Sequence, residues 1–371
     1  MLQWSSMSQK RVVLGLSGGV DSSVSAYLLQ KAGYVVEAVF MKNWEEDDTD
    51  TYCSAQQDRE DAEAVCQRLK IPFHTVNFAS EYWDRVFSYF LETYRMGWTP
   101  NPDVICNQEI KFKAFLDYAH HLKADFMATG HYAARLDTPY GPELHRALDE
   151  NKDQTYFLCR ISKEALATTL FPLATLTKNK VRQLANELGF QNAHKKDSTG
   201  ICFIGERKFK TFLQQYLPAQ PGLIQTVDGR SLGQHEGLMY YTLGQRSGLL
   251  IGGQKNALQQ PWYVVAKRMT DNVLVVAQNA YHPWNMSRTL SASDAHWFYP
   301  PPPRFQAEAR LRHRGSLVPC EVLANGQQMQ VAFLQAQPSV TPGQACVLYQ
   351  GTRCLGGGTI ASTDSEGGIL R

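Results

Sequence analysis

The stretch at residues 17–23, with the sequence SGGVDSS, constrains the fold of this chain more than any other feature. Residues 11–16 before it form a short, apolar, β-branched run that is typical of a buried strand. After it, Val24, Tyr27 and Leu28 follow helical spacing up to a glycine at position 33. The glycines of the stretch therefore connect a strand to a helix. Such a turn lets the backbone approach a ligand, and the free N–H groups of the helix attract an anion, so we expect a phosphate site.

The residue types of this turn indicate which phosphate chemistry it serves. It lacks the Gly-Lys-Ser/Thr ending of a P-loop, so it does not indicate transfer of a γ-phosphoryl group. A carboxylate in a phosphate site, Asp21, is expected mainly to hold Mg²⁺ between itself and phosphate oxygens. The pattern resembles the pyrophosphate-loop ATPase superfamily, whose members attach AMP to a substrate oxygen; a glycine turn needed only for packing is the alternative. We predict an ATP site formed by Gly15, Leu16, Ser17, Gly18, Gly19, Val20, Asp21, Ser22, Met41 and Gly130.

Further apolar runs alternate with helical periodicity through the first half of the chain. Residues 34–40, 72–78 and 125–129 are the expected strands, and this rhythm predicts a doubly wound parallel sheet with helices on both faces. Ligands of open parallel sheets sit at the carboxyl ends of the strands. Met41 and Gly130 lie at two such ends. Met41 is expected either to pack on adenine or to fill the core, and Gly130 to let the nucleotide approach closely.

The length of 371 residues favours two or three domains. From about residue 211 the rhythm changes to short strands separated by glycines, which predicts small β domains. We expect a catalytic domain with the ATP loop at 1–210, a small central β-rich domain at 211–287 and a C-terminal β-barrel at 288–371. The four prolines at 300–303 are expected to form a stiff connector near the domain junction.

Charge and cysteine usage narrow the class of protein. The net charge of +2 excludes a globally basic nucleic-acid coat, so a polyanion would have to meet local patches. No run of about 18 apolar residues is present, and the first ten residues do not resemble a signal peptide, so we expect a cytoplasmic protein without membrane attachment, by default a monomer. The eight cysteines show no zinc-binding spacing and are expected to be thiols in a reducing compartment.

Two cysteines stand in settings that favour a reactive thiol. Asn107 is expected to cap a helix that begins before Ile110, which would place Cys106 just ahead of a helix N-terminus, where the dipole lowers the pKa of a thiol. Cys202 follows small residues in an expected loop, with Lys195 and Lys196 nearby. Each cysteine is either a nucleophile or a structural thiol.

An expected strand at residues 305–314 carries a row of arginines. Strand alternation would place Arg310, Arg312 and Arg314 on one face, about 6.6 to 7 Å apart along the strand. Such a row could contact RNA or simply face solvent.

The loop and these motifs together resemble the bacterial tRNA-specific 2-thiouridylases of the MnmA family over nearly the whole chain. The resemblance rests on residues 15–23, 101–107, 110–112, 130–132, 152–154, 200–203 and 312–313. It implies that Cys202 carries a persulfide, that Cys106 is the second catalytic thiol and that Asp103 acts near the target base. It further implies contacts to tRNA from Asn101, Pro102, Asp103, His131, Lys152, Asp153, Gln154, Arg312, His313 and Gln344.

The implied reaction adenylates the C2 oxygen of the wobble uridine, position 34, with ATP and Mg²⁺ and then replaces that oxygen with sulfur. The implied partners are the tRNAs for Lys, Glu and Gln and a sulfur source, either a persulfide-donating relay protein or a cysteine desulfurase. Two alternatives remain at this point: another AMP-forming pyrophosphate-loop ligase or tRNA sulfurtransferase, and an RNA-binding protein gated by ATP.

Overall fold

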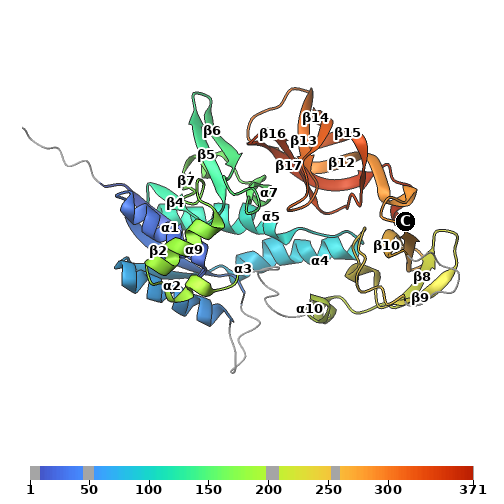
Figure 1. Ribbon diagram of the computed structural model, residues 1–371, viewed down its shortest axis with the longest axis horizontal. Helices are drawn as coiled ribbons and strands as arrows, with labels where there is room; N and C mark the ends of the chain where they lie inside the picture. The colour runs from blue at the N-terminus through green and yellow to red at the C-terminus, as the bar shows by residue number, and fades with distance from the viewer. Residues whose placement is uncertain (1–8, 45–53, 198–208, 252–259, 371) are drawn as a thin grey trace, which may run out of the picture. The chain divides into compact units, whose positions relative to one another are not determined.

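The computed structural model describes residues 9–44, 54–197, 209–251 and 260–370 (Figure 1). The chain forms two compact units. The first comprises Met1–Val86, Asp103–Gly205 and Thr352–Cys354, and the second comprises Phe87–Pro102, Glu206–Gly351 and Leu355–Arg371.

The first unit is built on a five-stranded parallel sheet in the order β3-β2-β1-β4-β7. The central strand β1 pairs in parallel with β2 and β4, and the outer pairings are also parallel. This confirms the α/β class with a parallel sheet. The strand bounds are β1 Arg11–Gly15, β2 Val35–Lys42, β3 Phe73–Asn77, β4 Phe126–Ala128 and β7 Thr169–Leu170.

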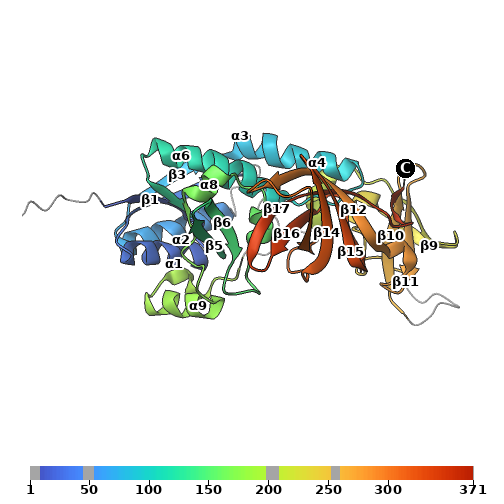
Figure 2. The same ribbon diagram turned by 90° about the horizontal axis from the view of Figure 1, so that it is seen from above.

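Alternation along β1 divides its residues between two helical layers. Val12 and Leu14 point into a buried core that includes Ala26 and Leu29 of α1 (Val20–Lys31) and Ala62 of α2 (Ser54–Leu69). Gly15 points the other way, since a Cβ on it would lie 3.3 Å from the ring of Phe115, the first residue of α6 (Phe115–His121). The sheet is therefore covered on both faces, as a doubly wound fold requires (Figure 2).

A long helical insertion joins β3 to β4. It comprises α3 Ala79–Tyr82, η1 Trp83–Phe87, α4 Ser88–Arg95, α5 Pro102–Cys106, η2 Asn107–Ala114 and α6. The expectation that Asn107 caps a helix is wrong, because the helical run already begins at Pro102 and the Asn107 side chain donates to the Asp103 carbonyl 2.9 Å away inside it. Proline is favoured at the first position of a helix, so Pro102 starts this one.

The first unit contains further short elements after β4. They are β5 Ala133–Thr138, β6 Gly141–Arg146, α7 Thr155–Leu158, α8 Lys163–Ala167, α9 Lys178–Glu187 and η3 Gln191–His194. Val20 and Val24 of α1 pack with Val181 and Ala185 of α9 in one buried cluster. This packing holds α9 beside the first turns of α1.

The second unit contains a five-stranded sheet in the order β18-β10-β11-β8-β9. Its core includes Ile224, Val264, Leu274 and Val276. The last strand of the chain pairs in parallel with β10, so it lies in this sheet. The bounds are α10 Phe209–Tyr216, β8 Gly222–Thr226, β9 Ser231–His235, η4 Leu238–Tyr240, β10 Trp262–Arg268, β11 Val273–Gln278 and β18 Gly368–Leu370.

The second unit also contains a closed six-stranded barrel in the order β12-β15-β14-β13-β16-β17, closed by pairing of β12 with β17. Val322, Val331, Leu348 and Ile360 fill its interior. This confirms the predicted C-terminal barrel. The bounds are η5 Pro283–Asn285, β12 Met286–Trp297, β13 Arg304–Arg310, β14 Val318–Asn325, β15 Gln328–Pro338, β16 Ala345–Gln350 and β17 Arg353–Thr363.

Two expectations about the barrel are wrong. The prolines at 300–303 lie between β12 and β13, two strands of the same barrel, and so do not connect domains. The three arginines do not share a strand face, because β13 ends at Arg310 and a turn follows in which Gly315 N–H donates to the Arg312 carbonyl at 3.0 Å. Arg310 itself is buried and lies over the ring of Tyr349 at 5.2 Å.

Among the helices of the described ranges, none is both long enough and apolar enough to cross a membrane.

Candidate functional site

The turn between β1 and α1 is held in one conformation from several directions. Gly18 has φ +74°, and a Cβ on it would lie 2.1 Å from the Asp58 carbonyl oxygen. The buried side chain of Asn192 donates to the Gly18 carbonyl at 2.8 Å and to Ser23 Oγ at 2.9 Å. Gly19 has extended φ and ψ angles and precedes the first residue of α1. The backbone of the turn is therefore fixed independently of any ligand.

The hydroxyls of the turn divide into two groups. Ser22 Oγ accepts from the backbone N–H of Ser17 at 3.2 Å and donates to the Gly19 carbonyl at 3.1 Å. Ser23 Oγ donates to the same carbonyl at 2.8 Å. Both side chains are buried, whereas Ser17 is exposed. Ser22 and Ser23 thus stabilise the turn, and Ser17, although exposed as a residue, has its Oγ 3.2 Å from Ser22 Oγ.

Met41 and Gly130, which are predicted to flank the nucleotide, approach the turn in different ways. Met41, near the end of β2, approaches Gly15 so closely that a Cβ there would lie 3.0 Å from Met41 Cε. A Cβ on Gly130 would lie 2.8 Å from the backbone nitrogen of Ser22. Glycine at position 130 is therefore required by the close approach of the α1 backbone, and its contact with a nucleotide stays a prediction.

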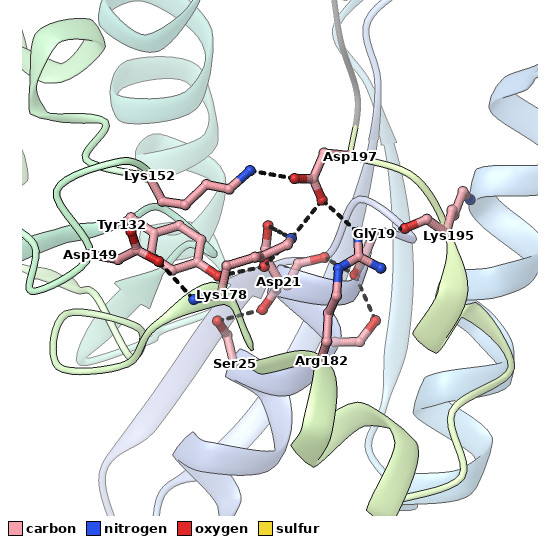
Figure 3. Close-up of polar contacts among 12 residues, drawn as sticks. Gly19, Asp21, Ser25, Tyr132, Asp149, Lys152, Lys178, Arg182, Lys195 and Asp197 are labelled. Atoms are coloured by element: carbon pink, nitrogen blue, oxygen red, sulfur yellow. Dashed lines mark hydrogen bonds and ion pairs between the residues drawn. The ribbon is translucent and has the colours of Figure 1, made fainter. Parts of the chain in front are cut away.

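Asp21, in the first turn of α1, is the centre of a polar cluster (Figure 3). Lys178 Nζ donates to its two carboxylate oxygens at 2.7 and 2.8 Å. The Tyr132 hydroxyl donates to Asp21 Oδ1 at 2.9 Å. Burial, and then the negative charge of Asp21, raise the pKa of Tyr132 far above its usual value, so this hydroxyl stays protonated as a donor.

A second carboxylate, Asp197, faces the same lysine. Its oxygens lie 2.7 Å from Lys178 Nζ, 2.5 Å from Lys152 Nζ and 3.1 Å from Arg182 Nη2. Burial opposes its ionisation, but the hydrogen bonds from Lys152 and Lys178 outweigh it and lower the pKa of Asp197 to about 2. Asp149 accepts from the backbone N–H of Lys178 at 2.9 Å.

The residues present fit a magnesium ion only in part. Among the residues that the structure describes, no group of three or more His, Cys, Asp or Glu side chains is placed to hold a metal. Asp21 is the carboxylate of the turn, and its oxygens already accept from Lys178 and Tyr132. An ion bound at Asp21 would therefore take most of its oxygen ligands from a bound phosphate and from water.

Asp103 and Cys106 lie three residues apart in α5, on the same face of the helix. The Cys106 thiol is buried, and Asp103 is half-buried. Burial raises the pKa of Asp103 against the opposing charge of Lys111. The sequence analysis expected Cys106 to lie just ahead of a helix N-terminus. The helix begins at Pro102, however, so Cys106 lies at the end of its first turn.

His131 lies close enough to Lys111 for the lysine charge to affect its ring. Burial, with a further contribution from Lys111, lowers the pKa of His131 well below its ordinary value, so the ring is neutral. Its Nδ1 lies 2.9 Å from Thr129 Oγ1.

Several predicted tRNA contacts have structural partners. The buried carboxylate of Asp153 accepts from Thr155 Oγ1 at 2.9 Å, and Gln154 Oε1 accepts from the backbone N–H of Tyr132 at 2.9 Å. Gln344 Nε2 donates to the carbonyls of Thr99 and Pro100, which directly precede Asn101 and Pro102. Arg312 is exposed and His313 is half-buried in the turn after β13. Cys202 lies outside the described residues.

Sequence reasoning missed Lys178, Arg182 and Asp197 as members of the cluster. Lys178 is the first residue of α9, where a cation opposes the helix dipole, and it is 8% exposed. A lysine directly after the capping Thr177 was the one local signal that could have identified it.

Three family models match consecutive parts of the chain. Residues 10–206 match the tRNA methyl transferase HUP domain, 210–278 the tRNA methyl transferase PRC-barrel domain and 287–360 the aminomethyltransferase beta-barrel domain.

Solved structures are similar over part of the chain. The U34-tRNA thiolase NcsA from Methanococcus maripaludis aligns with a TM-score of 0.35 and 20% identity over 56% of this chain and 65% of that one. A 4-thiouridine synthetase in complex with RNA and ATP aligns with the same TM-score and identity over 56% and 50%. At TM-scores this low, neither likeness supports an inference about activity.

Full-length relatives are much more similar. A tRNA-specific 2-thiouridylase MnmA from Idiomarina loihiensis is 57% identical over 97% of this chain and 99% of its own length. Proteins of the same name are 56% identical in Shewanella amazonensis, over 95% of both chains, and 54% identical in Vibrio cholerae, over 97% and 98%. The chain therefore belongs to the family of tRNA-specific 2-thiouridylases named MnmA.

Proposed function

We propose that this chain is a tRNA 2-thiouridylase, which converts uridine 34 of tRNA to 2-thiouridine with consumption of ATP. The observation that carries the proposal is the identity of 54–57% with proteins of that name over at least 95% of the chain. The geometry of the first unit supports it, because a rigid glycine turn at a helix N-terminus suits a polyphosphate and α5 presents a thiol and a carboxyl group on one face.

The first half of the reaction activates a poor electrophile. The C2 carbonyl of uridine belongs to a urea-like group, and its oxygen does not leave readily. When that oxygen attacks the α-phosphorus of ATP, the bond to pyrophosphate breaks and an O-adenylate forms, so that AMP can leave in the second half. Residues 15–22 are the proposed phosphate site, and Met41 is the proposed neighbour of the base.

Magnesium would be held by Asp21 together with phosphate oxygens, and it would supply positive charge to the departing pyrophosphate. The chain's own contribution is the fixed turn, the N–H groups of α1 and the Ser17 hydroxyl, which are oriented before the ligand arrives.

The second half of the reaction delivers sulfur from a persulfide on Cys202. In one route Cys106 attacks Cys202 Sγ, the persulfide bond breaks and the released hydrosulfide adds to C2. In the other route the terminal sulfur adds to C2 first, and Cys106 then forms the bond to Cys202 Sγ. Both routes release AMP and leave a disulfide that takes two electrons from an external thiol reductant. The raised pKa of Asp103 suits proton transfer beside the target base.

The proposed partners are wobble-uridine tRNAs for Lys, Glu and Gln and a persulfide donor, either a relay protein or a cysteine desulfurase. Bases of an anticodon loop can be turned outward, so a flipped uridine reaches a pocket without melting a helix. The proposed contacts are those of the sequence analysis, from Asn101 through Gln344. We place the reaction in the cytoplasm, with the enzyme as a monomer.

The test is a reaction of the purified chain with Mg-ATP, a persulfide donor and unmodified tRNA, followed by mass analysis of the digested nucleosides. We expect a sulfur-for-oxygen gain on uridine 34 in the wild type and none in Cys106→Ser or Cys202→Ser. Cys66→Ala is the matched control, since burial raises the pKa of the Cys66 thiol to about 12 and it should be inert. AMP release without thiolated nucleoside would contradict the proposal and favour a ligase.

A further inference from the structure

Three cations from two segments of the first unit converge on one carboxylate. Lys152 precedes α7, whereas Lys178 and Arg182 lie one turn apart on α9, and all three place a nitrogen within 3.1 Å of Asp197. Lys178 simultaneously bonds both oxygens of Asp21, at the N-terminus of α1. The cluster therefore extends without a break from the proposed phosphate turn to Asp197 (Figure 3).

Most ion pairs of this cluster converge on Asp197. All three cations pair with it, Lys178 also pairs with Asp21, and the third carboxylate, Asp149, accepts from the backbone N–H of Lys178. Lys178 is the first residue of α9, where the helix dipole repels a positive charge. Its side chain is also 90% buried, and burial removes the solvation that a cation needs. Asp197, Lys152 and Arg182 keep about 26% to 33% of their side chains exposed, so the cluster is open to solvent on that side. An anion with more charge than a carboxylate would satisfy these cations better.

We propose that Lys152, Lys178 and Arg182 bind the β- and γ-phosphates of ATP, and that Asp197 holds these cations in place until the phosphates displace its carboxylate. The inference rests on the proposed function, in which ATP lies at residues 15–22. The glycine turn has no lysine that could reach the outer phosphates. The inference therefore assigns contact with these phosphates to Lys178 and Arg182. It also gives Lys152, one of the proposed tRNA contacts, a second role at the nucleotide.

The proposed role is electrostatic. As the uridine oxygen bonds to the α-phosphorus, the bond from that phosphorus to the bridging oxygen breaks and its electron pair stays on pyrophosphate. The negative charge on the outer phosphates therefore grows as they leave. Cations already arranged around Asp197 would stabilise that charge without rearranging at the moment of reaction.

Calorimetric titration with inorganic pyrophosphate, with ATP and with AMP tests the assignment. We expect Lys178→Met and Arg182→Met each to weaken pyrophosphate and ATP binding about 10-fold to 100-fold, the effect of losing one charge-assisted hydrogen bond, while AMP affinity changes less than about twofold. Lys180→Met is the matched control on the same helix, because Lys180 is exposed and donates to Gln183. It should leave all three affinities unchanged.

Asp197→Asn gives the sharper test because the expected sign is opposite. Removing the carboxylate that competes with phosphate should tighten binding of pyrophosphate and ATP several-fold, even though it removes ion pairs and lowers the melting temperature. If the cluster only joins α9 to α1, Asp197→Asn lowers the melting temperature without tightening binding, and that result would overturn the inference. If Lys178→Met does not fold, the binding affinities of Arg182→Met and Asp197→Asn still test the inference.

The outcomes separate this inference from the function on which it rests. Variants that bind pyrophosphate like the wild type, in a chain that thiolates tRNA, would refute the cation assignment alone. A wild type that binds pyrophosphate through these cations but never thiolates tRNA would refute the proposed function alone. A wild type that binds no pyrophosphate would refute the cation assignment directly.

Discussion

Lys267 offers a quantitative test of the energetics of the second unit. It lies in β10, its side chain is 0% exposed, and its Nζ donates to the Gly97 carbonyl at 2.8 Å. Burial lowers the pKa of Lys267 from 10.5 to about 7. We predict that Lys267→Met removes a large part of the pH dependence of unfolding between pH 7 and pH 9.

The sign follows from proton binding. Between these pH values the unfolded chain keeps the Lys267 proton while the folded chain releases it, so stability rises with pH. The lowered pKa costs the folded state about 4 kcal/mol at pH 7 and about 2 kcal/mol at pH 9, at about 1.4 kcal/mol per pKa unit. The wild type should therefore gain about 2 kcal/mol from this one group, and the methionine variant should not.

The assay is urea unfolding at both pH values for the wild type and for Lys267→Met. Subtracting the two proteins cancels the other titrating groups, and the unpaired Gly97 carbonyl adds a constant cost of about 1 to 3 kcal/mol to the variant at both pH values. The exposed Lys180→Met serves as control and should titrate like the wild type. A stability difference between Lys267→Met and the wild type that is the same at pH 7 and pH 9 would refute the reasoning.

Three further predictions concern the turn and the proposed RNA contacts. Asn192→Ala removes two hydrogen bonds and should destabilise the chain by about 1 to 3 kcal/mol and raise the KM for ATP, with tRNA affinity unchanged; an unaltered KM would show that the turn does not depend on it. Gly130→Ala should lower the melting temperature and impair AMP release, because its Cβ would meet the Ser22 backbone at 2.8 Å; a wild-type melting curve would contradict this. Arg312→Ala should weaken tRNA binding and reduce its salt slope by about 1, unlike Arg304→Ala, whose guanidinium pairs with Glu321; equal slopes in both variants would exclude Arg312 as a phosphate contact.

The parts of the fold that local sequence controls were predictable. The strand, glycine turn and helix at residues 11–31 depend on interactions within a few residues, and the structure reproduces them as β1 and α1. The alternation of apolar runs with helical periodicity likewise predicted a parallel sheet, because parallel neighbours need a crossover helix. The barrel followed from short strands separated by turns.

Local reasoning failed where two signals competed. Asn107 was expected to start a helix, but the helix begins earlier, at Pro102, because proline is favoured at the first helical position. Alternation assigned three arginines to one strand face, but β13 ends at Arg310, whose guanidinium lies over Tyr349 from another strand. Burial of an arginine by a distant aromatic ring cannot be seen in the period of its own segment.

The sequence by itself determined the phosphate-binding turn, the order of the α/β and β segments and the positions of the candidate thiols, because each is encoded by neighbouring residues. Only the tertiary structure decided which charges surround the turn. Lys178 reaches Asp21 across 157 residues, and Asp197 collects cations from positions 152, 178 and 182. Electrostatic interactions act through space, so the partners of a charge become defined only when packing brings distant segments together.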